Sequence, residues 1–291
     1  MFMKKQSWFS SKKVTDIKIK RKESTKVSGP MDNKDTFDNQ EIKKNLQSFY
    51  DKEAKKYAET RKKFWHEEKV ILNEITPLFK ENKKVRILEF GCWSGRFASL
   101  LNQNFTGKFD YVGIDLSNEL LWYASKDNPN LTFFQWDITK LVKNFEQESF
   151  DLIVWTSSFQ HIPTNKERSF LMKNFYRLLD YDWMLLITNW SMSNWFIKKN
   201  WKIVLKAKAL SWLKLDKGSS RDLMVPRSDG NWEVYKRYYH FFSLKELEKM
   251  TIFSWLTIKI NKYLNDNWEF TDNEKLSRSS LLVATKTPVI S

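Results

Sequence analysis

Val85–Leu101, with the sequence VRILEFGCWSGRFASLL, is the stretch that decides the fold. Its first part is apolar and rich in β-branched residues, which is typical of a buried strand, and this run ends at Gly91. A helix-forming segment begins near Gly95. Glycine allows a tight turn and close approach of a ligand, and the new helix presents unpaired N–H groups. The pattern therefore predicts a strand, a glycine turn and a helix that together form a nucleotide pocket.

Three further segments extend this pattern along the chain. Tyr111–Ser117 reads as a second buried strand that ends in Asp115, and Leu131–Ile138 reads as a third that ends in Asp137. In nucleotide-binding α/β folds, an acid about 20 residues after the glycine turn accepts hydrogen bonds from the ribose hydroxyls. Phe150–Ile162 supplies a fourth strand and the loop after it.

The turn, E-x-G-x-x-x-G-R, resembles the first motif of class I S-adenosylmethionine (SAM) methyltransferases, [DE]-x-G-C-G-x-G-[RK]. Trp93 departs from this motif, because it stands where the family has its middle glycine. The resemblance implies a Rossmann-like, seven-stranded, mostly parallel sheet with helices on both faces. Met184–Trp190 would be its fifth strand, Leu256–Ile260 and Leu281–Ala284 its closing antiparallel pair, and an α-helical insertion would follow the fifth strand.

The same resemblance implies SAM as the cofactor and assigns its contacts. The turn would hold the methionine end, Asp115 the ribose and Asp137 the adenine, while the loop after the fourth strand would form the floor of the site. The implied cofactor residues are Glu89, Gly91, Cys92, Trp93, Gly95, Arg96, Asp115, Leu116, Ser117, Asp137, Ile138, Ser158 and Phe159.

Two segments outside this core resemble one subgroup, the tRNA wobble-uridine carboxyl methyltransferases. The first, Tyr50–Trp65, lies in a helix expected from Asp38 to about Lys63 and is similar to the subgroup's lid; the second is the D-x-x-V-P … R-Y-Y-H-x-F pattern of residues 222–242. We expect Tyr50, Tyr57, Arg61, Arg237, Tyr238 and Tyr239 on the acceptor side. A carboxylate acceptor needs no general base, whereas a hydroxyl or amine acceptor would need one, with His161, His240 and Asp222 as the candidates.

Composition narrows the class of protein. The chain of 291 residues is 41% hydrophobic, which suffices for one large α/β domain, and none of its apolar runs is long enough to span a bilayer. The single cysteine, Cys92, permits neither an internal disulfide nor a CxxC metal site and fits a cytoplasmic protein. The net charge of +15 favours a polyanionic partner, with RNA, and tRNA in particular, as our leading expectation.

The charge and the helical periods also predict the domain organisation. Residues 1–37 read as a disordered basic tail and residues 38–291 as the methyltransferase domain, with residues 191–242 as a substrate-side insertion. The first half of the insertion, residues 194–215, has six lysines and no acid among many apolar residues, which suits RNA or a membrane surface. A small activating partner protein and the oligomeric state are left open by the sequence.

Tryptophan usage is anomalous. The chain has 14 Trp and only 7 Gly, and an indole at position 93 would enter the space of the cofactor's amino acid end. Further tryptophans stand where a turn or strand end normally has glycine: Trp136, Trp183, Trp232, Trp255 and, less clearly, Trp155 and Trp268. We hypothesise that UGA codons, which some bacterial lineages read as glycine, were decoded as tryptophan at these positions. Trp65 and Trp190 match the resemblance and would be genuine.

Three functions remain open at this stage. The first is an RNA methyltransferase acting on a modified uridine of tRNA, and the second is a methyltransferase of small molecules or lipid intermediates. The third is a methyltransferase-like binding module without activity, whose cofactor site is closed by a genuine Trp93.

Overall fold

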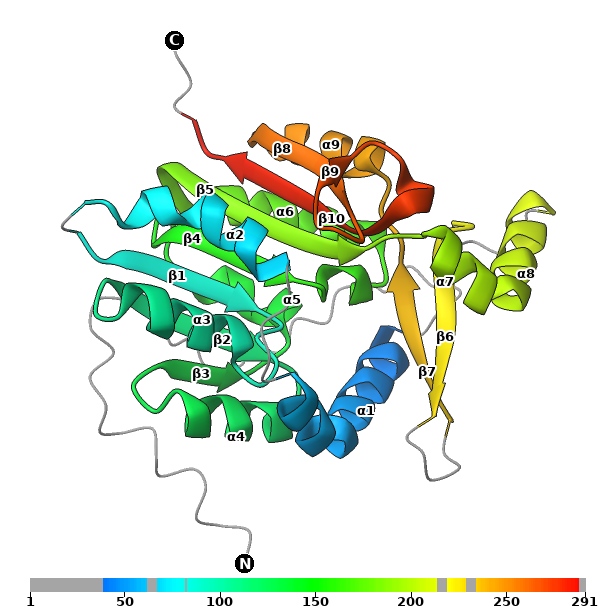
Figure 1. The fold of residues 1–291 in the computed structure, drawn as a ribbon, viewed down its shortest axis with the longest axis horizontal. Helices are drawn as coiled ribbons and strands as arrows, with labels where there is room; N and C mark the ends of the chain where they lie inside the picture. The colour runs from blue at the N-terminus through cyan, green and yellow to red at the C-terminus, as the bar shows by residue number, and fades with distance from the viewer. Residues whose placement is uncertain (1–38, 62–66, 82, 214–218, 229–233, 288–291) are drawn as a thin grey trace, which may run out of the picture.

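The computed structural model describes residues 39–61, 67–81, 83–213, 219–228 and 234–287. The expected basic tail, residues 1–37, lies outside the described residues, as do Trp65 and Trp232. Figure 1 shows a central twisted sheet flanked by helices, with a narrow two-stranded ribbon and a helical segment projecting to one side.

The central sheet has eight strands in the order β3-β2-β1-β4-β5-β10-β8-β9. The first five strands in the chain are parallel, and the last three add an antiparallel edge. The expected count of seven is therefore corrected to eight, because the short β9 pairs with the end of β8. The strands are β1 (Val85–Phe90), β2 (Phe109–Asp115), β3 (Thr132–Gln135), β4 (Phe150–Thr156), β5 (Leu179–Trp190), β8 (Thr257–Asn265), β9 (Phe270–Thr271) and β10 (Ser277–Thr285).

Helices cover both faces of this sheet, and each face has its own apolar core. Consecutive strand residues point to opposite faces, so Ile87 packs with α2 and α3 while its neighbour Leu88 packs with α6 and α9. The helices beside the sheet are α2 (Glu67–Ile75), α3 (Arg96–Phe105), α4 (Asn118–Asp127), α5 (Ile138–Leu141), α6 (Asn165–Leu178) and α9 (Leu244–Ile252). Short 3-10 helices are η2 (Thr76–Phe79), η3 (Val142–Asn144), η4 (Phe159–His161) and η5 (Glu274–Leu276).

The long first helix, α1 (Asn39–Thr60), lies at the carboxyl-terminal edge of the parallel strands, where it packs against α4 and β7 (Figure 1). Its buried face includes Phe49, Ala54 and Tyr57, at the helical spacing that the sequence shows. The sequence-based expectation of a helix here is confirmed. Its position makes α1 a lid over the end of the sheet where ligands of α/β folds bind.

The insertion after β5 differs from the expectation. Its first half forms α7 (Asn194–Lys199) and α8 (Trp201–Trp212), but its second half forms an antiparallel ribbon of β6 (Asp222–Ser228) and β7 (Val234–His240). The insertion is therefore not wholly α-helical. The physical reason is visible in β7, VYKRYYH, where aromatic and β-branched residues favour a strand.

Three of the suspect tryptophans have a left-handed backbone. Trp93, Trp255 and Trp268 have φ angles of 53°, 59° and 64°. A bulky side chain at positive φ is a genuine outlier, whereas glycine adopts this region without penalty. In the described residues, Trp136, Trp155 and Trp183 do not share this feature. The structure thus supports a glycine-type backbone at three of the positions and gives no such support at the other three.

Two features are absent from the described residues. No helix among them is both long enough and apolar enough to cross a bilayer. Within the same residues, no group of three or more His, Cys, Asp or Glu side chains is placed to hold a metal ion.

Candidate active site

The turn after β1 and the end of β2 lie together, as the sequence predicts. Gly91 and Gly95 have φ angles of 61° and 77°, so both use the conformation that favours glycine. The Asp115 carboxylate accepts hydrogen bonds from the backbone N–H of Trp93 at 3.0 Å and of Ser117 at 2.9 Å. Burial raises the pKa of Asp115 to about 6, although these backbone donors oppose the shift. Asp115 is therefore ionised at neutral pH and suited to accept bonds from ribose hydroxyls.

The Trp93 side chain lies between this turn and the lid helix. Its indole stacks on Tyr57, with ring centroids 5.4 Å apart and planes at 25°, and meets Tyr50 edge-on at 5.1 Å. The Arg61 guanidinium lies 5.7 Å from the indole and 3.7 Å from the Tyr57 ring. The ribose side of the pocket thus fits SAM, while the indole fills space between the turn and the acceptor side.

Glu89, at the acidic position of the first motif, is almost fully buried at 1% exposure. Its carboxyl group accepts a hydrogen bond from the hydroxyl of Tyr111. Burial raises the pKa of Glu89 to about 8, and the nearby Asp115 charge adds to the increase. The side chain is therefore protonated at neutral pH and contributes a neutral hydrogen-bonding group beneath the turn.

Several predicted cofactor residues have other partners in the structure. Asp137 caps α5 by accepting from the Thr139 backbone at 3.0 Å and forms an ion pair with Lys43 at 3.1 Å. Arg96 forms an ion pair with Glu68 at 2.7 Å. The adenine and methionine contacts predicted for Asp137 and Arg96 thus compete with protein partners.

The remaining cofactor candidates line the turn or the core beneath it. Cys92 is buried, and burial raises the pKa of its thiol well above the usual range, so it is no nucleophile. Phe159 stacks on Phe242 in the core with centroids 5.2 Å apart. Ser158 packs so closely on Gly91 that a Cβ at position 91 would lie 2.1 Å from the Ser158 hydroxyl. The other candidates, Leu116 and Ile138, follow β2 and begin α5.

The acceptor-side candidates form a cluster around Arg237. This side chain is 5% exposed, and its Nη1 lies 3.4 Å from the hydroxyl oxygens of both Tyr50 and Tyr57. The rings of Phe49 and Tyr239 flank the guanidinium at 4.6 and 5.2 Å. Its Nε has no hydrogen-bond partner, and among the described residues no carboxylate forms an ion pair with it. Arg237 is therefore a buried cation surrounded by phenols and rings.

His161 connects this cluster to the ribbon. Its Nδ1 lies 2.7 Å from the backbone carbonyl oxygen of Tyr238. Because a carbonyl oxygen can only accept, Nδ1 carries the hydrogen and donates a hydrogen bond to that oxygen. Its Nε2 then accepts from the Tyr50 hydroxyl at 3.3 Å. Burial is the main cause that lowers the pKa of His161 to about 3, and it also raises the pKa of Tyr50. His161 is thus neutral at physiological pH and a weak base.

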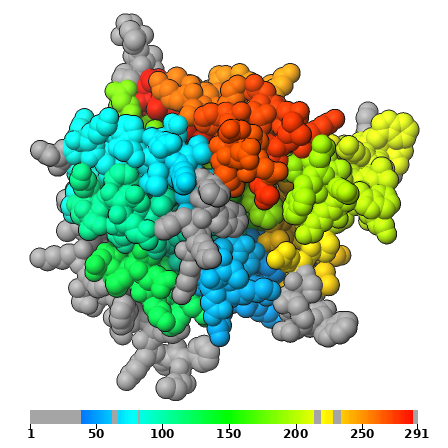
Figure 2. Space-filling model, in the orientation of Figure 1, coloured from blue at the N-terminus to red at the C-terminus, as the bar shows by residue number. Residues whose placement is uncertain are grey.

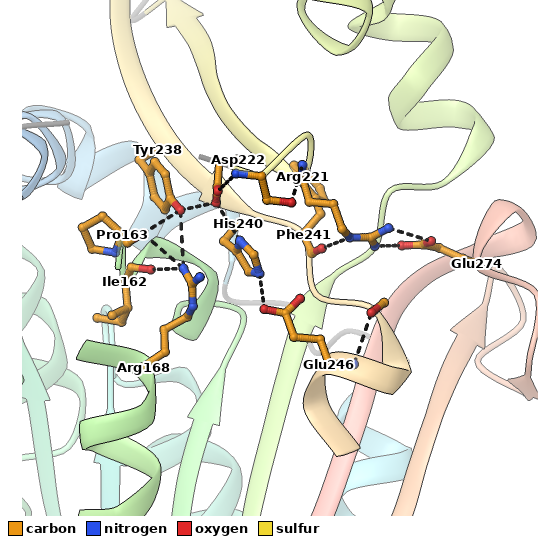
Figure 3. Close-up of polar contacts among 12 residues, drawn as sticks. Ile162, Pro163, Arg168, Arg221, Asp222, Tyr238, His240, Phe241, Glu246 and Glu274 are labelled. Carbon is orange, nitrogen blue, oxygen red and sulfur yellow. Dashed lines mark hydrogen bonds and ion pairs between the residues drawn. The ribbon is translucent and has the colours of Figure 1, made fainter. Parts of the chain in front are cut away.

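Tyr238, His240 and Asp222 belong to a different face of the ribbon, because alternate residues of β7 point in opposite directions. Figure 3 shows that His240 lies between two carboxylates, with Nδ1 2.6 Å from Asp222 and Nε2 2.8 Å from Glu246. The Tyr238 hydroxyl bonds to Asp222 and, at 2.9 Å, to the carbonyl of Pro163. These groups are hydrogen-bonded to one another and to the backbone, so a role of His240 or Asp222 as a base would require one of these bonds to break and stays a prediction.

The pKa values of the two carboxyl groups agree with these hydrogen bonds. Burial alone would raise the pKa of Asp222, but hydrogen bonds from His240 and Tyr238 outweigh it and hold the pKa below its ordinary value. Burial would also raise the pKa of Glu246, but the hydrogen bond with His240 outweighs it, so the pKa of Glu246 is lowered. Arg168 extends the network from α6, where its Nη1 donates to the carbonyl of Ile162 at 2.9 Å (Figure 3).

Sequence reasoning missed four residues of these sites. Phe49 packs on the Arg237 guanidinium, Lys43 neutralises Asp137, and Glu246 with Arg168 completes the His240 network. The helical period marks Phe49 as buried, but nothing local marks its partner on β7. Glu246 carries the Ser-x-x-Glu spacing of a helix cap, and the structure confirms that Ser243 caps α9.

Comparisons with known proteins identify the class of this core. The sequence pattern of the family described as "Methyltransferase domain" matches residues 87–182. A SAM-dependent methyltransferase from Methanosarcina mazei has a similar structure, with a TM-score of 0.56, 21% identity, and coverage of 73% of this chain and 97% of that chain. An S-adenosylmethionine-dependent methyltransferase from Clostridium acetobutylicum is similar with a TM-score of 0.53 and 15% identity over 84% of this chain and 99% of that one. Residues 87–182 thus match a methyltransferase domain, and the chain shares the fold of these SAM-dependent methyltransferases.

Two further comparisons concern acceptors and partners. A malonyl-[acyl-carrier protein] O-methyltransferase from Bacillus cereus is 28% identical over 135 residues, which cover 46% of each chain. This chain thus spans about half the length of the curated relatives it matches. A Haloferax volcanii methyltransferase in complex with the Trm112 methyltransferase activator is similar in fold, with a TM-score of 0.54 and 14% identity over 84% of this chain and 97% of that one. None of the proteins named here confirms the wobble-uridine subgroup, which stays a prediction.

Proposed function

We propose that this protein is a SAM-dependent methyltransferase that methylates a carboxylate of its acceptor. The observation that carries the proposal is the buried Arg237 guanidinium, which has phenol partners and an unpartnered Nε in place of an acidic partner. A buried charge without a counterion is costly. An acceptor carboxylate would supply the missing anion.

The chemistry of His161 supports the same acceptor. Methyl transfer from SAM is a displacement in which the sulfonium is already an activated leaving group, so alignment of the acceptor and exclusion of water are the main requirements. A carboxylate is ionised at neutral pH and needs no base. The neutral His161, whose pKa is about 3, would be a poor base for a hydroxyl or amine, but it fixes the Tyr50 hydroxyl beside Arg237.

The proposal also concerns the kind of molecule that carries the methylated carboxylate. The curated relatives are named for a malonyl group on an acyl-carrier protein. A carboxylated uridine in tRNA would offer the same functional group, but recognition of RNA commonly stacks bases on exposed aromatic rings, and Tyr238 and Tyr239 are only 0% and 2% exposed. We therefore favour a small or carrier-linked carboxylate over RNA. A small activating protein, as in the Haloferax complex, would be an additional partner.

The test is the alkali stability of the product. The full chain and its Trp93→Gly variant are incubated with methyl-tritiated SAM and, separately, with malonyl-loaded carrier protein, free malonyl thioester and tRNA bearing a carboxylated wobble uridine. Methyl esters release tritiated methanol in mild alkali, whereas methylated amines, carbons and ethers do not. Alkali-labile label on any acceptor supports the proposal, and the acceptor labelled names the carrier. Alkali-stable label would overturn it, and absence of both labelling and SAM binding would favour the inactive module.

A further inference from the structure

The strongest unassigned feature is the outer surface of α7 and α8, residues 194–213. Of the large apolar side chains that the structure exposes, five lie in this short stretch: Trp195 at 67%, Trp201 at 55%, Leu205 at 59%, Trp212 at 83% and Leu213 at 52%. Monomeric proteins rarely expose such contiguous apolar patches without a partner. Figure 2 shows that this segment projects from the body of the molecule.

Apolar side chains lie on two sides of α8, one packed against the protein and one facing solvent. Val204 is buried and packs with Phe196, Leu223 and Val225, so one side of α8 is anchored to the ribbon. Trp201, Leu205 and Trp212 recur at i, i+4 and i+11, which places them in one outward stripe. The exposed Lys202 and Lys206 lie beside this stripe, and Lys208 lies within it.

The charge and the residue types of this stripe indicate which class of partner it would bind. Residues 194–213 contain five lysines and no acid, so the occupant must be anionic. Exposed leucines need an apolar environment, which RNA bases and phosphates do not provide, and every cation is a lysine, without the arginines that pair with phosphate in a fork. Tryptophan beside lysine on an amphipathic helix is typical of a lipid headgroup interface.

We propose that α7 and α8 dock onto an anionic phospholipid surface, with Trp201, Leu205 and Trp212 entering the headgroup region and the lysines meeting lipid phosphates. These tryptophans are not among the residues with a left-handed backbone, so they differ from Trp93, Trp255 and Trp268. The surface is separate from the Arg237 cluster, and the inference does not depend on the acceptor.

The test is co-sedimentation of the full chain with vesicles of phosphatidylcholine alone and of phosphatidylcholine mixed with phosphatidylglycerol. We expect binding only to the mixed vesicles, and weaker binding as salt is added. The variant Trp201→Ser/Leu205→Ser/Trp212→Ser should bind at least about tenfold more weakly, and Lys202→Gln/Lys206→Gln/Lys208→Gln should also lose binding. All six side chains are solvent-exposed, so unchanged thermal melts are expected.

A matched control uses α9 and the residue that follows it, which also expose lysines and an aromatic ring. Lys245→Gln/Lys249→Gln/Phe253→Ser removes a similar set, including Phe253 at 74% exposure, and should bind vesicles like the parent. Equal loss in this control, or no binding to the mixed vesicles, would overturn the proposal. So would a parent dimer that the α8 variants convert to a monomer, or a gel-shift assay in which those variants lose RNA and not vesicles.

Discussion

The Trp93 indole stacks on the Tyr57 ring at 5.4 Å while its own backbone has a φ angle of 53°. A strained turn residue thus fills the gap between the cofactor turn and the lid helix. We expect the chain with Trp93 to bind SAM weakly or not at all, and Trp93→Gly to bind it, because glycine removes both the indole and the strain. Calorimetric titration of SAM into both proteins checks this. Tight binding by both would show that the indole moves aside at little cost.

The same reasoning makes a stability prediction at Trp255, which has a φ angle of 59° and is 66% exposed. Replacing it by glycine relieves positive-φ strain and loses little burial, so Trp255→Gly should raise the free energy of unfolding by about 1 kcal/mol. The matched control is Trp122→Gly in the middle of α4, where the exposed tryptophan is helical and glycine should cost about 1 kcal/mol. Urea denaturation of the three proteins measures both changes.

These results also bear on the coding hypothesis. UGA at positions 93, 255 and 268, with UGG at position 190, would mean that the natural protein has glycine at the three left-handed positions. UGG throughout would make Trp93 a genuine residue of a closed pocket. The structure distinguishes among these tryptophans in a way that the sequence did not, since Trp155 has a strand backbone and packs among Phe90, Phe159 and Phe175 in the core, although its buried indole N–H has no hydrogen-bond partner.

Arg237 gives the prediction that concerns the acceptor. Arg237→Met keeps much of the side-chain volume and removes the charge, so the KM for the carboxylate acceptor should rise roughly 10- to 100-fold while SAM affinity is unchanged. Lys236→Met is the control, because its side chain is exposed on the neighbouring position of β7. Steady-state kinetics with varied acceptor provide the measurement. An unchanged KM in Arg237→Met would remove Arg237 from the acceptor site.

The sequence predicted the parts of this protein that depend on local pattern. Strand β1, the Gly91 turn and the end of β2 follow from apolar periodicity and glycine chemistry within short segments, and Asp115 lies at the turn as expected. The ribbon was predicted as helix, because the insertion was assigned as a unit and the aromatic and β-branched content of β7 was not read as a strand.

The catalytic roles predicted for His240 and Asp222 stay predictions, but the surroundings of these residues could not be read from the sequence. Which face of a strand a residue occupies depends on where the ribbon packs, and that is settled by tertiary contacts. Adjacent residues such as Arg237 and Tyr238 therefore enter different environments, one the phenol cluster and the other the Asp222 network. A motif names the residues but does not say which of them share a pocket.

Cofactor binding should depend on the ionisation of Asp115. The charged carboxylate accepts hydrogen bonds from both ribose hydroxyls more strongly than the protonated acid, and its pKa is about 6, so SAM affinity of the Trp93→Gly protein should fall as the pH drops below about 6. Asp115→Asn in the same background should bind more weakly at pH 7 and lose this pH dependence. Titrations between about pH 5 and pH 8 measure the effect. A parent affinity that stays constant over this range would contradict the role of Asp115.

The His240 network should stabilise the fold in a pH-dependent manner. His240→Gln removes the partner that keeps the pKa values of Asp222 and Glu246 low, so the free energy of unfolding should fall by about 2 kcal/mol near neutral pH. Because both pKa values lie below their unfolded values, this stabilisation is present above the unfolded pKa and lost as the pH falls through the folded values. The difference between parent and variant should therefore shrink in acid. A variant of parental stability whose turnover is lost would instead make His240 catalytic.

Glu89 should show the opposite dependence, because burial raises its pKa to about 8, above the value of about 4.5 in the unfolded chain. The folded state then binds a proton that the unfolded state has lost, so the stability that this group contributes is fully present below the unfolded pKa and is lost as the pH rises through the folded pKa. Glu89→Gln mimics the protonated side chain and cannot ionise. The variant should therefore gain stability relative to the parent by at least about 1 kcal/mol between pH 5 and pH 8. Urea denaturation across this range measures the difference, and a constant difference would mean that Glu89 is already ionised in the folded protein.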